Sequence, residues 1–148
     1  MLKYELLHPE ILAALGAAGH GSKVLIADGN YPYSTGTYSN ARRVYLNLTR
    51  GLVKVTDVLR VLIEAIPIEA AEVMMPKSGK EPAIFREFRT TLPADVQLKH
   101  LDRFKFYDAA RSIETALVIA TGEERLYACI LLTIGVVPPP PHAKEKHG

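Results

Sequence analysis

The stretch Gly19-His20-Gly21-Ser22-Lys23-Val24-Leu25-Ile26-Ala27-Asp28-Gly29-Asn30-Tyr31-Pro32 decides how the chain is organised. Its apolar run, residues 23–27, is rich in Val, Leu and Ile and is bounded by glycines, which predicts a buried β-strand. His20 then precedes the strand and Asp28 follows it. Because a strand rises by about 3.3 Å per residue, the two side chains cannot reach one small ligand across a straight strand. Either the flanking loops fold back over the strand, or two copies of the chain share one site.

The chain has the composition of a single globular domain, with 148 residues of which 48% are hydrophobic and 23% charged. Its net charge of +2 is small, and Lys and Arg are scattered outside the C-terminal tail, so we expect no nucleic-acid partner. The longest apolar runs fall far short of the ~20 residues of a membrane span, and the N-terminus lacks a signal-peptide core, so we expect no membrane partner. Cys129 is the single cysteine and cannot form an internal disulfide, which favours a cytoplasmic location.

Hydrophobic periodicity predicts four helices, and the strongest pattern lies between Val55 and Ile66. The predicted helices cover residues 9–18, 55–66, 82–92 and 102–114. The predicted strands cover residues 23–27, 43–48, 71–75, 97–101, 116–120 and 127–134. The fourth strand is expected at a sheet edge, and the last two are expected to pair with each other. Strands that alternate with helices indicate a compact α/β domain with a central mixed β-sheet flanked by helices.

The domain is expected to span residues 1–137. Residues 138–148 form a proline run followed by charged residues, which cannot bury apolar surface, so we expect a flexible tail. Residues 29–40 form a turn-rich loop in which three tyrosines are interspersed among Gly, Asn, Ser, Thr and Pro.

Several motifs that resemble known sites do not fit their structural context. Residues 16–23 are glycine-rich, but they precede a strand, whereas a phosphate-binding loop opens a helix. The five histidines have neither the spacing of a zinc motif nor a neighbouring cysteine, so no metal site is predicted. Cys129 lies inside an apolar segment with no feature that lowers a thiol pKa, which indicates a buried, inert thiol.

His20 is the first candidate catalytic residue. A histidine in a glycine-flanked loop can donate, accept and exchange protons near neutral pH. The alternative is a loop histidine that hydrogen-bonds to the backbone. Asp28 stands before a glycine, which is also typical of a turn. Tyr127 is equally consistent with packing in a strand, and Arg103 with a solvated first turn of a helix. The residues alone therefore do not decide whether these three side chains are functional.

A set of short segments, in this order and spacing, resembles the D-ribose pyranase and L-fucose mutarotase family of sugar-ring isomerases. The matching segments span nearly the whole chain except the tail: His8-Pro9-Glu10, Leu15-Gly16, Gly19-His20-Gly21, Ala27-Asp28-Gly29-Asn30-Tyr31-Pro32, Val73-Met74-Met75, Arg103-Phe104-Lys105-Phe106-Tyr107, Thr121-Gly122-Glu123, Tyr127-Ala128-Cys129-Ile130-Leu131-Leu132 and Gly135-Val136. Gly21 after His20, the segment from Arg103 and the segment from Thr121 resemble the fucose mutarotase branch more closely.

The resemblance implies that His20 is the catalytic acid and base. It implies that Asp28, Arg103 and Tyr127 bind the sugar and that position 129 lines the same pocket. In the reaction we expect Asp28 to orient His20 or to accept a sugar hydroxyl, and Tyr127 to act as a second proton relay or as a hydroxyl ligand. The family usually has asparagine at that position. This chain has Cys129, and a thiol cannot replace the donor and acceptor of an amide.

The activity implied by the resemblance is interconversion of the anomers or ring forms of L-fucose or a related reducing sugar by acid/base ring opening, without a metal or redox cofactor. Tyr31 or a loop neighbour is expected to stack on the apolar face of the sugar. The family also implies a compact α/β fold and ring-shaped homo-oligomers, commonly decamers of two stacked pentamers, with sites completed by neighbouring subunits. The alternatives are a non-catalytic monosaccharide-binding protein linked to transport or regulation, and a structural oligomer whose site has decayed. The sequence does not separate turnover from binding, because both use the same pocket.

Overall fold

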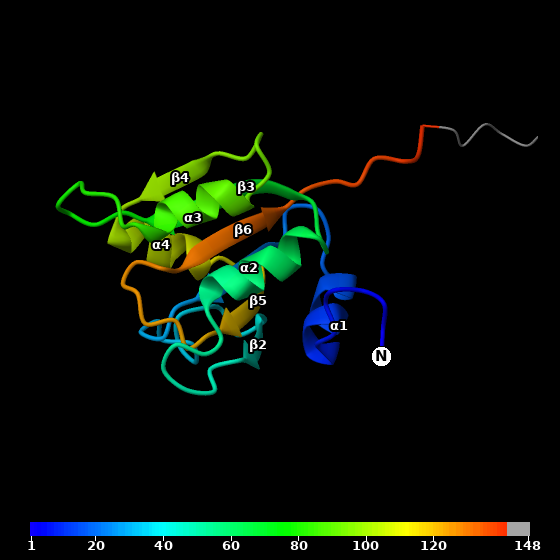
Figure 1. The fold of residues 1–148 in the computed structure, drawn as a ribbon, viewed down its shortest axis with the longest axis horizontal. Helices are drawn as coiled ribbons and strands as arrows, with labels where there is room; N and C mark the ends of the chain where they lie inside the picture. Colours follow the sequence, from blue (N-terminus) through cyan, green and yellow to red (C-terminus); the bar gives the residue numbers. More distant parts are fainter. Residues whose placement is uncertain (142–148) are drawn as a thin grey trace, which may run out of the picture.

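The computed structural model describes residues 1–141 of the chain, which hold four helices and six strands (Figure 1). The helices are α1 (Pro9–Ala17), α2 (Val55–Ile63), α3 (Ile84–Thr91) and α4 (Arg103–Ala110). The strands are β1 (Lys23–Ala27), β2 (Arg42–Tyr45), β3 (Ile68–Met74), β4 (Leu98–Leu101), β5 (Thr115–Ala120) and β6 (Ile130–Ile134). Residues 138–141 are exposed and belong to no helix or strand, and the rest of the predicted tail lies outside the described residues.

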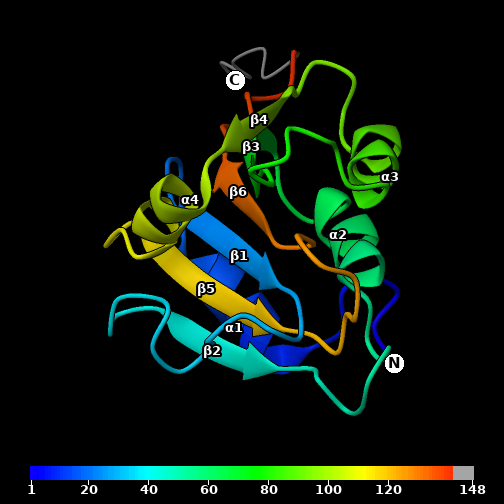
Figure 2. The ribbon, with the colours of Figure 1, turned by 90° about the vertical axis from the view of Figure 1, so that its left-hand side faces the viewer.

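The six strands form one mixed sheet in the order β2-β5-β1-β6-β3-β4 (Figure 2). β5 is parallel to β1 and to β2, and β3 is parallel to β4. β6 runs antiparallel to both of its neighbours, β1 and β3. Five strands therefore point in one direction, and their carboxyl ends meet the start of β6 at one edge of the sheet. We call this the carboxyl edge and the opposite one the amino edge.

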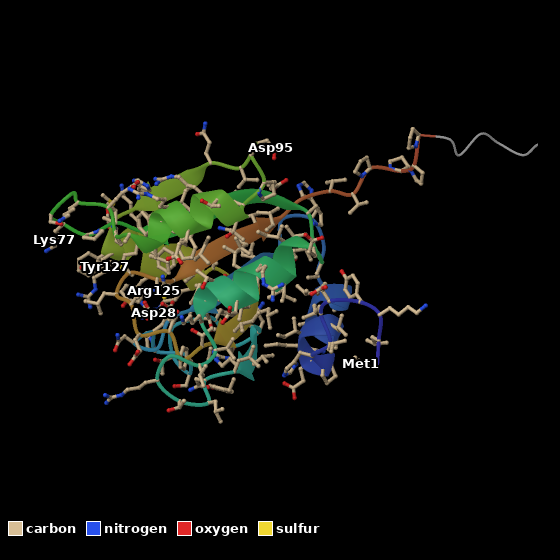
Figure 3. All side chains as sticks on the ribbon, viewed as in Figure 1. Met1, Asp28, Lys77, Asp95, Arg125 and Tyr127 are labelled. Carbon is tan, nitrogen blue, oxygen red and sulfur yellow. The ribbon has the colours of Figure 1, made fainter. Side chains whose placement is uncertain are left out.

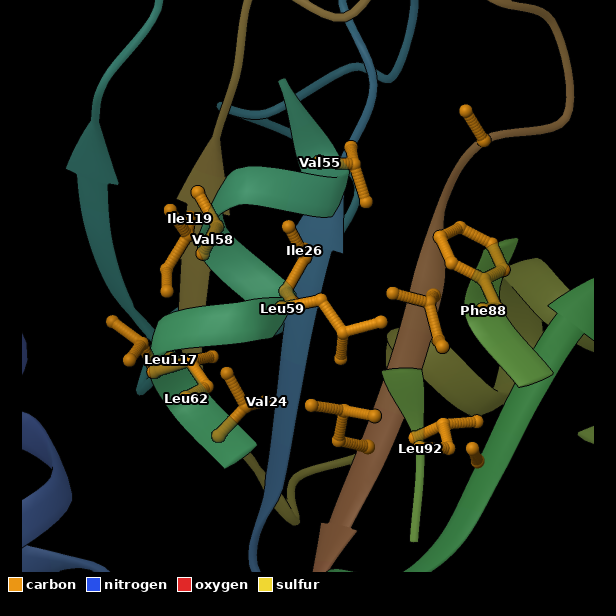
Figure 4. Packing of buried hydrophobic residues seen from close by; sticks show 14 of the residues in the cluster. Val24, Ile26, Val55, Val58, Leu59, Leu62, Phe88, Leu92, Leu117 and Ile119 are labelled. Atoms are coloured by element: carbon orange, nitrogen blue, oxygen red, sulfur yellow. The ribbon is translucent and has the colours of Figure 1, made fainter. Parts of the chain in front are cut away.

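Helices cover both faces of the sheet. One hydrophobic cluster joins α1, α2 and α3 to strand residues such as Val24, Ile26 and Ile119 (Figure 4). A smaller cluster joins α4 to the alternate strand residues, among them Leu25 and Val118. Figure 2 shows α4 on one side of the sheet and α2 with α3 on the other. The predicted α/β domain with a central mixed sheet and flanking helices is thus confirmed.

The local sequence explains why these elements form. Four of the five β1 residues are buried, as expected for an apolar strand that is covered on both faces. α2 buries one apolar face, and the Asp57 carboxylate accepts a hydrogen bond from the backbone N–H of Lys54 just before the helix. α4 begins after Asp102, whose carboxylate accepts a hydrogen bond of 3.0 Å from the backbone N–H of Lys105.

The predicted pairing of the last two strands is wrong. β1 lies between β5 and β6, parallel to the first and antiparallel to the second. Residues 121–129 therefore do not form a hairpin but cross the carboxyl edge, where the Thr121 hydroxyl donates to the Ala27 carbonyl at 2.7 Å. The physical reason is that a buried central strand needs backbone partners on both sides, and β1 obtains them by separating β5 from β6.

Most other predicted bounds agree within a few residues, and β4 is an edge strand as predicted. β6 begins three residues later than expected, because Tyr127 has a φ of 58°, which an extended strand does not allow. β2 is shorter than predicted, and β3 begins at Ile68 rather than at position 71. α2 and α4 both end earlier than predicted, each in a turn that leads into the next strand.

Candidate active site

The carboxyl edge brings five of the six predicted site residues to one cavity of about 200 Å³, which we call the edge pocket. Asp28 follows β1, Arg103 begins α4 after β4, and Cys129 immediately precedes β6. Tyr31 and Tyr127 come from the loops after β1 and before β6. Figure 3 shows Asp28 and Tyr127 at this end of the molecule. Ligands of open α/β sheets typically bind outside the carboxyl ends of the strands, so the edge pocket is the candidate active site.

Asp28 supplies the buried charge of the edge pocket and is only 6% exposed. Its two carboxylate oxygens accept hydrogen bonds from the backbone N–H groups of Asn30 at 3.0 Å and Ala128 at 3.2 Å. Burial raises the pKa of Asp28, and these hydrogen bonds oppose the rise. A carboxylate has about four acceptor positions, so the fixed Asp28 side chain keeps capacity for the hydroxyl groups of a ligand.

Cys129 lies beside Asp28 and is 3% exposed. Its Sγ accepts a hydrogen bond of 3.3 Å from the backbone N–H of Asp28. Burial raises the pKa of the Cys129 thiol well above its ordinary value, and the nearby Asp28 carboxylate adds to the rise. Cys129 is therefore a neutral thiol, in agreement with the inert side chain that the sequence predicts.

Two stacked tyrosines and an arginine form the side of the edge pocket next to α4. The ring centroids of Tyr31 and Tyr107 are 5.6 Å apart, and the Arg103 guanidinium lies 5.7 Å from the Tyr107 centroid. The Tyr31 hydroxyl donates a hydrogen bond of 2.6 Å to the Gly36 carbonyl, and burial raises its pKa. Tyr31 thus presents a fixed neutral ring, whereas the exposed Arg103 has donors available for a ligand.

Tyr127 combines a strained backbone with a place at the pocket mouth. Its positive φ is sparsely populated for residues other than glycine, and such conformations cost roughly 1–3 kcal/mol and cluster at functional sites. The same turn directs the next backbone N–H, that of Ala128, to the Asp28 carboxylate. The side chain of Tyr127 is partly exposed and lines the pocket beside Leu126.

Arg43 on β2 fixes the tyrosine-rich loop after β1. Its guanidinium donates to the carbonyls of Tyr33 at 2.9 Å, Ala41 at 3.2 Å and Thr37 at 3.3 Å, and to the Thr37 hydroxyl at 3.1 Å. One side chain thus holds three points of the loop between residues 33 and 41 against the sheet. The loop is therefore a defined wall beside the pocket, which explains how a polar segment can hold Tyr31 in place.

A larger cavity of about 460 Å³ adjoins the edge pocket, and Asn30 lines both. It is lined by polar side chains and by the segment Thr121-Gly122-Glu123. This segment supports the fold, because a Cβ at Gly122 would lie 2.1 Å from the Thr49 carbonyl oxygen. We place the candidate site in the smaller pocket, where the buried carboxylate and the strained loop lie.

His20 lies outside the edge pocket, at the amino edge of the sheet. Its Nε2 lies 2.9 Å from Glu69 Oε2 near the start of β3. The five residues of β1 separate His20 from Asp28 by roughly 16 Å, since a strand rises by about 3.3 Å per residue. The loops do not fold back over β1, so a single chain does not bring His20 to the pocket.

Comparison with known proteins places the chain in a family. The pattern that defines the RbsD / FucU transport protein family matches residues 1–137. The chain belongs to this family. It is 30% identical over 145 residues to fucose mutarotase of Danio rerio, which covers 90% of this chain and 91% of the relative. It is 33% identical over 141 residues to D-ribose pyranase of Variovorax paradoxus (strain S110), which covers 92% and 98%.

Solved structures of the RbsD / FucU family share the fold. Bacillus subtilis RbsD complexed with D-ribose has a TM-score of 0.80 and 23% identity, over 93% of this chain and 100% of that chain. Fucose mutarotase of Streptococcus pneumoniae in complex with L-fucose has a TM-score of 0.79 and 25% identity, over the same shares. The predicted family and fold are therefore confirmed, and mutarotases and pyranases are sugar-ring isomerases, so the chain belongs to a family of isomerase-type enzymes.

Four lining residues of this RbsD / FucU protein were not among the predicted site residues: Asn30, Met74, Tyr107 and Leu126. Tyr107 had a signal in the sequence, whereas the place of Met74 follows from the order of the strands. Tyr107 is four residues after Arg103 on a helix, and this spacing places both side chains on one face. Met74 ends a strand parallel to β1, so it reaches the same edge of the sheet as Asp28.

Within residues 1–141, no group of three or more His, Cys, Asp and Glu side chains is placed to hold a metal ion. In the same part of the chain, no helix has the length and apolar character needed to cross a bilayer.

Proposed function

We propose that this protein is a monosaccharide mutarotase, which interconverts the anomers or ring forms of a reducing sugar. The edge pocket carries the proposal, because it gathers a buried carboxylate, an arginine and tyrosines around a cavity suited to a small ligand. Family membership supports it, since relatives include a fucose mutarotase and a D-ribose pyranase.

Ring opening of a sugar hemiacetal needs one proton acceptor and one proton donor. The base takes the proton of the anomeric hydroxyl, and the electron pair of that O–H bond forms the carbonyl. The bond between the anomeric carbon and the ring oxygen breaks, and the ring oxygen takes its electron pair and a proton from the acid. The freed aldehyde rotates, and the reverse steps close the ring on the other face. Protons and electrons balance, so the reaction needs neither metal nor redox cofactor.

The pocket residues bind and orient the sugar in this proposal. The Asp28 carboxylate accepts one or two sugar hydroxyls, and the Arg103 guanidinium donates to others. Tyr127, at the pocket mouth, acts as a second proton relay or hydroxyl ligand. Tyr31 offers its ring to the apolar face of the sugar, because its own hydroxyl is held by the Gly36 carbonyl.

We propose that His20 of a second copy of the chain completes the site as the principal acid and base. A glycine-flanked histidine exchanges protons near neutral pH, and His20 is exposed at the amino edge. The distance along β1 excludes the pocket of its own chain, whereas a head-to-tail arrangement brings an amino edge to a neighbouring carboxyl edge. A closed ring of subunits, a decamer of two pentamers by resemblance, repeats this contact at every site.

L-fucose is our first substrate candidate, because Gly21 and the segments from Arg103 and Thr121 resemble the fucose mutarotase branch. The cytoplasmic location that the single cysteine favours stays a prediction.

Saturation-transfer NMR on L-fucose, D-ribose and D-galactose tests the function. Faster exchange between the two anomers on addition of the protein supports a mutarotase. Ligand shifts without faster exchange favour the alternative, a monosaccharide-binding protein linked to transport, which the description of the family also suggests. No shift and no exchange with any sugar contradicts both.

Mixing two inactive variants tests the shared site. His20→Gln and Asp28→Asn each damage a different half of the site, so each alone is expected to be nearly inactive. When equal amounts of the two variants are refolded together, some sites take His20 from an Asp28→Asn chain and Asp28 from a His20→Gln chain. Random assembly makes up to about a quarter of the sites intact in this way. No recovery on co-refolding, with assembly intact, contradicts the contribution of His20 by a second copy.

A further inference from the structure

Met74 and Cys129 place two sulfur atoms on one side of the edge pocket. Val73 of β3 is paired with Ile130 of β6, so the next positions, Met74 and Cys129, face each other across the neighbouring strands. Both belong to the hydrophobic cluster under α4 and both line the pocket. They are 8% and 3% exposed. We call this pair the sulfur wall.

The sulfur wall offers a ligand almost no hydrogen bonding. A thioether sulfur is a weak acceptor with no donor, and a thiol is weak in both roles. The Cys129 sulfur already accepts the backbone N–H of Asp28 at 3.3 Å. Phe106 and Leu131 of the same cluster are fully buried and apolar, so the sulfur wall belongs to an apolar part of the core.

Three polar side chains line the same pocket. Asp28, Asn30 and Arg103 bring a carboxylate, an amide and a guanidinium to the same cavity. A sugar bound with its hydroxyls on these groups turns carbon toward the apolar lining, and the sulfur wall is part of that lining. A hydroxyl on that carbon loses its hydrogen bonds to water and gains no equivalent partner, whereas a methyl or methylene group loses nothing.

We infer that the sulfur wall makes this enzyme selective for deoxy sugars over the same sugars with the hydroxyl present, and that Cys129 and Met74 are its specificity-determining residues. The inference rests on the proposed mutarotase function. The expected discrimination is about 10- to 100-fold, the range that an apolar pocket achieves against an added hydroxyl.

Three matched pairs of sugars test the inference: L-fucose with L-galactose, L-rhamnose with L-mannose, and 2-deoxy-D-ribose with D-ribose. Anomer exchange is measured by NMR, and each catalysed rate is divided by the uncatalysed rate of the same sugar. We expect at least one deoxy sugar to be favoured over its partner by roughly tenfold or more. Equal acceleration within all three pairs, or preference for the hydroxylated partners, overturns the inference and leaves the mutarotase function intact. No acceleration with any sugar overturns the proposed function and the inference together.

Variants of the wall assign the selectivity to its residues. Cys129→Ser replaces the thiol by a hydroxyl of similar size and should reduce the preference for the deoxy sugar several-fold. Cys129→Ala and Met74→Leu keep the wall apolar, so they should retain the preference even where overall activity changes. Because each comparison is a ratio of two sugars on one protein sample, partial loss of folded protein does not affect it. A ratio that is the same in Cys129→Ser and Cys129→Ala overturns the role of the wall.

Discussion

Asp28 is the residue at which burial and charge oppose each other most directly. Its carboxylate lies in the core of the carboxyl edge, where burial raises its pKa above 3.8, and two backbone N–H groups hold it in place. The same arrangement suits a ligand-binding role, because sugar hydroxyls can supply the hydrogen bonds that a carboxylate loses when burial excludes water.

Replacement of Asp28 by asparagine should alter how stability depends on pH. Because the pKa of Asp28 is raised in the folded protein, its protonated carboxyl stabilises the fold at pH values below 3.8, the pKa in the unfolded chain. This contribution is lost as the pH rises through the pKa of Asp28 in the folded protein. Asp28→Asn has no proton to lose there. The melting temperature of the variant minus that of the wild type should therefore become more positive as the pH rises through the acidic range. Asp95→Asn, at an exposed position, is the control and should give a level difference.

His20→Gln should abolish most turnover while the fold survives. His20 is an exposed loop residue whose contact with Glu69 is an exposed pair, and such pairs contribute about 0–1 kcal/mol to stability. Loss of a general acid and base lowers the rate by roughly 10²–10⁴-fold, so anomer exchange should fall by that amount. His100→Gln is a matched control, because His100 also lies beside a glutamate, Glu81 at 3.2 Å, but lines no part of the pocket. If His20→Gln exchanges as fast as His100→Gln, Tyr127 becomes the candidate acid and base.

At the scale of secondary-structure elements, the loop before β6 links the site to α2. The buried Glu123 carboxylate accepts a hydrogen bond of 3.3 Å from the backbone N–H of Val55 at the start of α2, and it also binds Arg125. Arg125 in turn binds Glu87 of α3. One buried carboxylate thus connects the carboxyl edge to two helices on the opposite face of the sheet from the edge pocket.

Glu123→Ala should therefore destabilise the fold by about 1–3 kcal/mol, because it leaves the Val55 N–H buried without an acceptor and removes a partner of Arg125. Glu124→Ala changes the neighbouring, exposed carboxylate and should stay within about 0.5 kcal/mol of the wild type. Urea unfolding at fixed protein concentration measures both free energies. Equal midpoints for the two variants would contradict the anchoring role of Glu123.

Local sequence predicted the elements well and their order in the sheet poorly. The continuous apolar run of β1 and the one-sided pattern of α2 are local signals, and both elements begin where they were predicted. The insertion of β1 between β5 and β6 depends on contacts between segments about a hundred residues apart, for which periodicity carries no information. The late start of β6, three residues after the predicted position 127, was not predictable for a related reason. Nothing in the residue type of Tyr127 signals a positive φ.

The site was predicted from the family resemblance more than from residue chemistry. The local sequence indicated His20 as a candidate catalytic residue but did not decide whether Asp28, Arg103 and Tyr127 are functional. The structure brings these last three side chains together with Tyr31 and Cys129 in the edge pocket. Met74 and Tyr107 were missed, because a methionine in an apolar strand and a tyrosine on a helix are both typical of a core.

At the scale of the whole molecule, the pocket mouth carries apolar surface that a monomer leaves in water. Leu126 is 66% exposed and Tyr127 is 37% exposed, and both line the edge pocket. Exposed apolar groups that gather at one place mark interaction surfaces. Together with the distance between His20 and Asp28, this surface supports assembly of copies around each site.

Light scattering of the purified protein should give a mass several times the 16.3 kDa of one chain. If a neighbouring copy completes each site, dilution below the dissociation range must lower the mass and the anomer-exchange activity per chain together. Leu126→Asp places a charge on the apolar pocket mouth and should shift this loss to higher protein concentration. Leu2→Asp is the control, because it makes the same change at an exposed leucine. Leu2 follows Met1, which lies on the other side of the molecule from Tyr127 (Figure 3). This variant should lose mass and activity at the same protein concentration as the wild type. A monodisperse monomer with full activity per chain would exclude the shared site and return the search for the acid and base to the residues of a single pocket.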